Sequence, residues 1–307
     1  MSIPLRRGYS LGPGTFQLSG FHGVEMRVSQ DLMLSVAFIC IGAQEAPTPC
    51  ATGFFLVHKG ARYFVTARHV AEELSETPFF IRFNQNGPGL GLLPIDFEMS
   101  NEPLLRWIGH PNPAIDLAVM AFPIAIWEQG MVSIDLNSEA AITLENPISD
   151  AGCGDMCHVI GLFSRVSGSQ RNVAVVHTGH IAAMPDSQEL IEVDLGGKAT
   201  QIEGFLVEIS NLRGLSGAPV FVRGGVELNV PIEGGRNVTI TALKPELKLL
   251  GVWAASWEKS ISMSSERVPV GMGIVTPAYR LIELLNSDPV VENTKAWIAK
   301  LKAAKAD

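Results

Sequence analysis

Between residues 31 and 275 the chain alternates short apolar runs with clusters of glycine, proline, asparagine and aspartate. Apolar runs of about four to eight residues bounded by such turn residues are typical of β-strands and are too short for helices. The predicted strands cover residues 53–57, 63–66, 117–122, 156–162, 173–177, 205–209, 219–222, 249–254 and 272–275. Many short strands at this spacing predict an all-β fold made of barrels or sandwiches.

The C-terminal stretch, residues 277–306, has a different pattern. Pro277 fits the first position of a helix, and the hydroxyl of Thr276 can cap that helix. An apolar stripe follows, formed by Tyr279, Leu281, Ile282, Leu284 and Leu285. A break at residues 287–289 separates a second predicted helix over residues 292–304, so the fold is expected to end in a helical tail.

Length, charge and hydropathy restrict what the chain can be. Its 307 residues suit one large domain or two closely joined ones. The 23 basic and 31 acidic side chains give a net charge of −8, whereas proteins that neutralise nucleic-acid phosphates normally present a basic surface. The best apolar run, residues 32–42, is far too short to cross a bilayer. We therefore expect neither a nucleic-acid partner nor membrane association.

The N-terminal residues and the cysteines bear on the compartment. Arg6 and Arg7 are followed by glycine, tyrosine and proline rather than by an apolar segment, so no signal peptide is expected. Four cysteines is a low count for this length and predicts free thiols in a cytoplasmic protein. Cys153, Cys157 and His158 lie close in sequence but lack a second ligand pair at zinc-like spacing, so we expect no metal ion.

Three segments carry residue types that can perform nucleophilic chemistry. A predicted hairpin over residues 51–66 delivers His69 just beyond its second strand, and Asp116 opens an apolar strand. Ser216 stands in the sequence Gly-Leu-Ser-Gly, directly before another strand. A serine hydroxyl is a poor nucleophile at neutral pH and needs a base such as histidine within hydrogen-bond reach. An aspartate can hold that histidine in the required tautomer.

In the order His, Asp, Ser, these segments resemble the chymotrypsin-like (trypsin-fold) serine peptidases. The residues that carry the resemblance are 66–70 (TARHV), 116–119 (DLAV) and 214–219 (GLSGAP). Residues 154–161, 178–183, 250–252 and 271–277 are similar to elements of the HtrA/Deg-type bacterial branch. The resemblance covers about residues 35–286, and we expect no PDZ domain after it.

This resemblance implies a fold of two six-stranded antiparallel β-barrels with the active site between them. The first barrel would span residues 30–125 and carry His69 and Asp116. Residues 126–150 would link it to a second barrel over residues 151–276, which carries Ser216. Residues 277–307 would form the C-terminal helices.

The resemblance also implies a serine endopeptidase that hydrolyses protein or peptide substrates through an acyl-enzyme intermediate. His69 would act as general base, Asp116 would orient it, and Ser216 would be the nucleophile. The backbone N–H groups of Gly214 and Ser216 would form the oxyanion hole. This chemistry needs no cofactor.

The chain departs from digestive peptidases at two points. Leu215 stands where those enzymes have an aspartate that pairs with a newly cleaved N-terminus, so activation by N-terminal cleavage is not expected. Ser210 falls where trypsin-like enzymes carry the aspartate that binds lysine or arginine. We therefore expect a neutral pocket for a small or medium apolar side chain. Its predicted lining consists of Ser210, Asn211, Leu212, Ala254, Ala255, Ser256 and residues 271–274.

Other hypotheses remain open from the sequence. The chain could be a latent peptidase fold that serves as a binding or regulatory module, because fold does not determine function. It could also be a peptidase that a protein partner activates. A metal-dependent hydrolase using His177 and His180 is disfavoured, since residues three apart on a strand face opposite sides. His110 is expected in a solvent-facing turn, although it could instead enter the cleft. Residues 223–248 form a long polar insertion, either a surface ornament or a loop for a partner or substrate.

Overall fold

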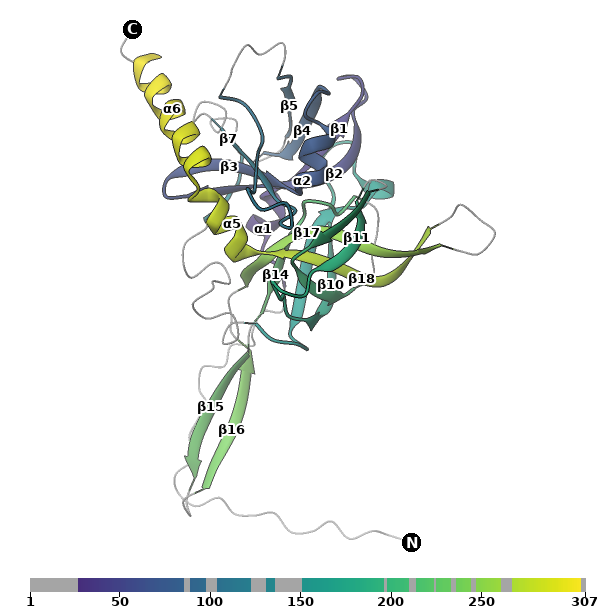
Figure 1. Cartoon of the computed structure of the whole chain (residues 1–307), viewed down its shortest axis with the longest axis vertical. Coiled ribbons are helices and arrows are strands. Elements are labelled where there is room, and N and C mark those ends of the chain that lie inside the picture. Colours follow the sequence, from purple (N-terminus) through teal and green to yellow (C-terminus); the bar gives the residue numbers. More distant parts are fainter. Residues whose placement is uncertain are drawn as a thin grey trace.

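The computed structural model describes residues 27–85, 89–97, 104–122, 131–135, 151–195, 198–209, 214–223, 225–232, 236–243, 247–260 and 267–304. Strands form most of its regular structure and gather into two main bodies, with helices at the C-terminal end (Figure 1). The predicted all-β fold class is confirmed. All nine strands named from the sequence correspond to strands of the structure, because buried strands leave a continuous apolar signal.

The first body is an eight-stranded sheet in the order β5-β4-β1-β2-β3-β7-β6, with β8 pairing in parallel to β2. Its strands are β1 (Val36–Ile41), β2 (Thr48–His58), β3 (Ala61–Thr66), β4 (Phe79–Asn84), β5 (Leu90–Ile95), β6 (Ile108–Gly109), β7 (Ala118–Ala121) and β8 (Ile134–Asp135). Two short helices, α1 (Gln30–Leu34) and α2 (Arg68–Glu73), accompany it. In the described residues this body has eight strands, two more than expected.

The second body is a closed antiparallel barrel of six strands, as expected, in the order β10-β13-β18-β17-β14-β9. These strands are β9 (Met156–Leu162), β10 (Ala174–Ala183), β13 (Phe205–Glu208), β14 (Pro219–Val222), β17 (Lys248–Ser260) and β18 (Arg267–Pro277). The short 3-10 helix η1 (Ser164–Val166) joins β9 to β10. Closure leaves no free edge within this barrel.

Two further hairpins belong to the second body. In one, β11 (Ile191–Leu195) pairs with β12 (Lys198–Ile202). In the other, β15 (Gly225–Ile232) pairs with β16 (Arg236–Leu243) inside the predicted insertion and extends away from both bodies (Figure 1). Of the predicted linker 126–150, only residues 131–135 are described, and β8 lies there.

The two C-terminal helices pack against strands of both bodies. Helix α5 (Ala278–Leu285) has Pro277 as its N-cap residue, so the prediction that Thr276 caps it is wrong: Thr276 belongs to β18. Helix α6 (Asp288–Ala304) begins earlier than expected because Pro289, in its first turn, has no intrahelical hydrogen bond to lose. Apolar side chains of both helices join a core that is shared by the first sheet and the barrel, among them Leu281, Leu284, Leu285, Val290 and Trp297.

No helix of the described chain is both long and apolar enough to span a membrane.

Candidate functional site

His69 and Asp116 meet at the ends of two neighbouring strands of the first sheet. His69 lies in the first turn of α2, directly after β3, and Asp116 precedes β7, the neighbour of β3. The backbone N–H of His69 donates to Asp116 Oδ1 at 2.9 Å, and His69 Nδ1 lies 2.8 Å from Asp116 Oδ2. A carboxylate at that distance favours the tautomer with hydrogen on Nδ1. The pair therefore leaves Nε2 of His69 as the proton acceptor.

The surroundings of His69 shift its basicity. Burial by itself lowers the pKa of a histidine, but the hydrogen bond and charge of Asp116, with the charges of Glu73 and Glu72, outweigh it here. The pKa of His69 is therefore raised above its usual value of 6.5. Asp116 is only 3% exposed, so water screens its charge poorly.

The loop before Asp116 is anchored to the second body. The Thr276 hydroxyl donates to the carbonyl of Asp116 at 3.4 Å, and the backbone N–H of Glu203 donates to the carbonyl of Ala114 at 2.9 Å. Thr276 therefore supports the Asp116 loop, a role the sequence analysis missed. No local sequence pattern could indicate this role, because the contact joins residues 160 positions apart.

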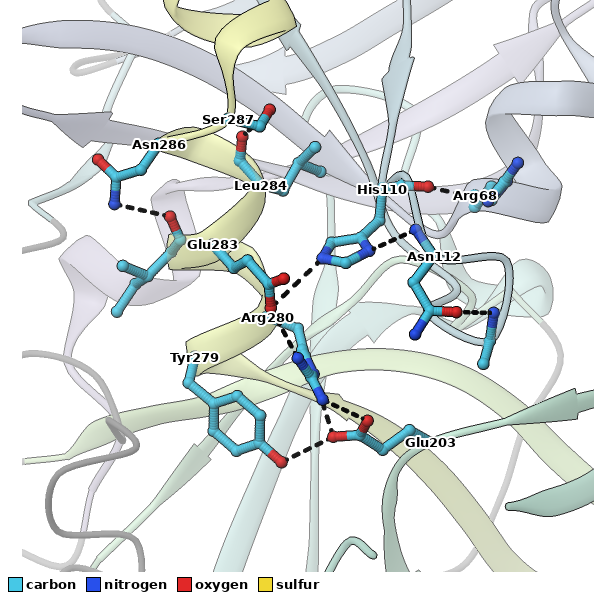
Figure 2. Close-up of polar contacts among 12 residues, drawn as sticks. Arg68, His110, Asn112, Glu203, Tyr279, Arg280, Glu283, Leu284, Asn286 and Ser287 are labelled. Carbon is cyan, nitrogen blue, oxygen red and sulfur yellow. Dashed lines mark hydrogen bonds and ion pairs between the residues drawn. The ribbon is translucent and has the colours of Figure 1, made fainter. Parts of the chain in front are cut away.

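A partly buried ion cluster on α5 reinforces this anchor, and Figure 2 shows its geometry. Arg280 binds Glu203 in a bidentate manner, with Nη2 2.7 Å from Oε2 and Nε 3.1 Å from Oε1. The Tyr279 hydroxyl donates to Glu203 Oε1 at 2.9 Å. The hydrogen bonds to Glu203 and Glu283 raise the pKa of Arg280, so its charge is permanent.

His110 completes the cluster, and its expected position in a solvent-facing turn is wrong. The residue is only 2% exposed, because its ring turns inward toward α5 (Figure 2). Its Nδ1 accepts from the backbone N–H of Asn112 at 3.1 Å, while Nε2 lies 3.6 Å from Glu283 Oε2. Its carbonyl accepts from Arg68 Nη1 at 3.0 Å, and Arg68 also binds Glu72 at 2.7 Å. Burial lowers the pKa of His110, so it is neutral at pH 7.

Replacing Glu203 with glutamine should destabilise the fold. The side chain is 3% exposed and accepts three hydrogen bonds, two from Arg280 and one from Tyr279. The substitution therefore leaves the Arg280 charge poorly compensated, at a cost of about 1–3 kcal/mol. The matched control is Glu283→Gln, whose carboxylate is 49% exposed and whose loss should cost less than about 1 kcal/mol. Urea denaturation of both variants measures the difference. Equal stabilities would contradict the anchoring role of Glu203.

Ser216 lies in a tight loop bounded by two glycines in left-handed conformations. Gly214 has φ +103° and Gly217 has φ +85°, a region in which other residues are strained. The N–H of Gly217 donates to the carbonyl of Trp253 at 2.8 Å. A Cβ atom at Gly217 would overlap the Thr66 hydroxyl and lie 3.1 Å from the Ala67 nitrogen. The Ser216 loop is thus packed against the residues that immediately precede His69.

Leu215, where digestive enzymes have an aspartate, points into the second barrel. Its side chain is 1% exposed and belongs to a cluster with Val159, Ile209 and Trp253. A Cβ atom at Gly161, on β9, would lie 2.8 Å from it, so the glycine makes room for the leucine. Apolar burial of Leu215 therefore helps to hold the loop in place.

A pocket of about 230 Å³ opens beside His69. Its lining combines the first body with strand β12 of the second, and consists of Arg68, His69, Glu72, Pro113, Asp116, Lys198, Ala199, Thr200 and Ile202. Side chains of both bodies thus border the space next to the imidazole. The contribution of β12 was not predicted.

The predicted specificity residues have different positions. Ser210, Asn211 and Leu212 lie outside the described residues. Ala254 and Ala255 are buried in a small cluster with Ile202 and Ile274, and Ser256 is half-buried. The two alanine side chains therefore face apolar neighbours.

Other nucleophiles and metal ligands gain no support in the described part of the chain. No three His, Cys, Asp or Glu side chains gather there closely enough to hold a metal ion. The four cysteines are free thiols. Burial raises the pKa of Cys40 and of Cys157 to about 12, so neither is a thiolate at neutral pH.

Comparisons with known proteins give likenesses of structure only. No family model and no curated protein sequence matches the chain. The MamO protease domain from Magnetospirillum magneticum is 14% identical, with TM-score 0.48, covering 84% of this chain and 99% of that one. The active form of the Rv3671c protease from M. tuberculosis is 14% identical, with TM-score 0.39 and coverage of 83% and 80%. The NSP4 proteinase from Equine Arteritis Virus is 11% identical, with TM-score 0.35 and coverage of 80% and 73%. These structural neighbours are trypsin- and chymotrypsin-like protease folds.

Proposed function

We propose that this protein is a serine endopeptidase whose catalytic residues are His69, Asp116 and Ser216. The observation that carries the proposal is the double hydrogen bond from His69 to Asp116, at 2.8 and 2.9 Å. It leaves Nε2 as the basic nitrogen, and the loop of Ser216 packs against the start of the helix that carries this ring. Histidine oriented by a buried aspartate is the base that serine nucleophiles require.

The mechanism follows from these positions. His69 Nε2 takes the proton of Ser216 Oγ as that oxygen attacks the substrate carbonyl, and Asp116 stabilises the resulting imidazolium. The N–H groups of Gly214 and Ser216 bind the oxyanion. The imidazolium then protonates the leaving amine, which departs and leaves an acyl-enzyme. Water, deprotonated by His69, hydrolyses the ester and restores Ser216.

On this proposal the Ser216 loop needs no newly cleaved N-terminus to hold it in its active conformation. In digestive enzymes a charged pair holds the corresponding segment, whereas here the 1% exposed side chain of Leu215 packs in the barrel core. The enzyme would therefore be competent without N-terminal cleavage.

We further propose that the substrate residue before the cleaved bond is small and apolar. The indole of Trp253 supports this, since it is 1% exposed and belongs to the same cluster as Leu215 and Ile209, on either side of the serine loop. A Cβ atom at Gly273, on the neighbouring strand β18, would overlap that indole, so the ring fills the space over Gly273. Beside this indole little room is left for a deep apolar pocket that could take a large substrate side chain.

Opening this space should broaden specificity. In Trp253→Val, cleavage after leucine or phenylalanine should rise about tenfold or more relative to cleavage after alanine. Trp257→Val, at a position that is 38% exposed, is the matched control and should keep the wild-type preference. A peptide-library cleavage assay measures both variants. An unchanged preference in folded Trp253→Val, or wild-type cleavage after arginine or lysine, would contradict the prediction.

Covalent labelling tests the function itself. A fluorophosphonate should modify Ser216 in the wild type, as read by mass spectrometry of the peptide containing it. Ser216→Ala should not be labelled, whereas Ser169→Ala, which removes an exposed serine outside the site, should be labelled normally. Absence of labelling in the folded wild type would sink the proposal and favour a latent binding module.

The remaining assignments are proposals of the same kind. The motifs favour the HtrA/Deg-type bacterial branch and protein substrates. If the purified enzyme is inactive, we expect a protein partner to activate it. The four free cysteines support a cytoplasmic location. Cell fractionation that recovers the protein outside the cytoplasm would contradict that location.

A further inference from the structure

Thr52, on strand β2 of the first body, reaches across to the serine loop of the second. The residue is fully buried, and its hydroxyl donates to the carbonyl of Gly214 at 2.6 Å. The same oxygen accepts the backbone N–H of Leu162, on β9, at 2.9 Å. One hydroxyl therefore joins β2, β9 and the start of the serine loop.

The backbone of Thr52 makes a second connection to the loop. Its N–H donates to the carbonyl of Ser216 at 3.0 Å. Its carbonyl accepts the hydroxyl of Thr66 at 2.8 Å, and Thr66 stands three residues before His69. Thr52 thus contacts the strand leading to the base and the loop carrying the nucleophile.

The bonds from Thr52 fix the two peptides on either side of the one that carries the N–H of Ser216. The carbonyls of Gly214 and Ser216 are held by Thr52, and the carbonyl between them, that of Leu215, accepts the N–H of Ala218 at 2.8 Å. In a planar trans peptide the N–H points opposite to the carbonyl. The N–H of Ser216 is therefore directed away from Ala218, with both neighbouring peptides fixed.

We propose that Thr52 is a positioning residue that aligns the oxyanion loop with His69. This inference rests on the proposed function, because it concerns the orientation of the N–H groups that would bind the oxyanion. Thr52 does not touch the reacting atoms. It acts through Gly214 and Ser216, and it does so from the body that carries the base.

A simpler reading is that Thr52 is a buried polar residue that only contributes stability. The two roles predict different effects of the substitutions Thr52→Val and Thr52→Ser on the reaction rate. Thr52→Val keeps the shape but leaves the carbonyl of Gly214 and the N–H of Leu162 without the hydroxyl. Thr52→Ser keeps the hydroxyl and loses a methyl group. A positioning role predicts that Thr52→Ser keeps the reaction rate of the wild type. It also predicts that steady-state kinetics of Thr52→Val show a lower kcat at an unchanged KM.

The experiment combines labelling with hydrogen exchange. In Thr52→Val the rate of fluorophosphonate labelling of Ser216, per folded molecule, should fall about 10²-fold, the scale of losing one oxyanion donor. Thr52→Ser should stay within about threefold of the wild type. The pH midpoint of labelling should be unchanged in both, because the His69–Asp116 pair is untouched. The backbone amides of Gly217 and Ala218 should exchange faster in Thr52→Val.

Each outcome decides the proposal. Wild-type labelling and exchange in folded Thr52→Val would overturn it, as would Thr52→Ser that is as slow as the valine variant. If Thr52→Val does not unfold cooperatively, Thr52→Ala takes its place under the same criteria. If the wild type itself is not labelled, the peptidase proposal fails separately, and the exchange of Gly217 and Ala218 alone decides whether Thr52 holds the loop.

Discussion

The variant His69→Ala is expected to hydrolyse peptides about 10⁶-fold more slowly than the wild type, measured as kcat. Without the imidazole, nothing in the described site can take the Ser216 proton during attack. KM should change little, because the imidazole is 19% exposed and lies at the wall of the pocket beside Pro113 and Thr200. Steady-state kinetics on a quenched peptide substrate give both parameters.

Combining this change with Ser216→Ala provides the control. Residues that act as one unit lose their effect together, so the double variant should be no slower than either single variant. Additive losses would mean that His69 and Ser216 work independently. A His69→Ala enzyme retaining more than a hundredth of wild-type kcat would show that another residue is the base.

Asp116→Asn is expected to lower kcat by about 10⁴-fold while the protein stays folded. The amide can still accept the backbone N–H of His69, but its NH₂ group would face Nδ1 and favour the tautomer with hydrogen on Nε2. That tautomer cannot accept a proton from Ser216. Asp116 accepts from both the ring and the backbone of His69, so its geometry is strictly defined.

The pH profile adds an independent reading of the same pair. The pKa of His69 is raised above 6.5, and catalysis needs the neutral imidazole. The wild-type rate should therefore climb with pH through a midpoint above 6.5 and fall as the imidazole is protonated below it. In Asp116→Asn the residual rate should have a lower midpoint, because the stabilising charge is gone. An unchanged midpoint would contradict the role of Asp116.

The sequence predicted the parts of this molecule that depend on local patterns. Buried strands such as β9 and β14 are continuous apolar runs, and both were predicted with their observed bounds. Strand β17 continues to Ser260, six residues beyond its predicted end. The candidate residues His69, Asp116 and Ser216 stood out because each lies at the end or start of such a run. Residue type and position relative to a strand marked these candidates, and their order in the chain gave the resemblance to chymotrypsin-like serine peptidases.

The sequence could not predict what arises from contacts between distant segments. Thr52 and Thr276 are ordinary strand residues in the sequence, and their roles come from bonds to residues 162 and 160 positions away. The inward turn of His110 depends on α5, which is near the other end of the chain. The hairpins β11–β12 and β15–β16 were missed because polar residues interrupt their apolar pattern.

The position of the C-terminal helices has a consequence for synthesis on the ribosome. Leu281, Leu284 and Trp297 complete the core that contains Phe54 and Val65 of the first sheet. The first sheet therefore cannot finish its core until residues 278–304 have left the exit tunnel. We expect the His69–Asp116 pair to become rigid only after that point of synthesis, so a shorter nascent polypeptide would carry no assembled site that could attack its neighbours.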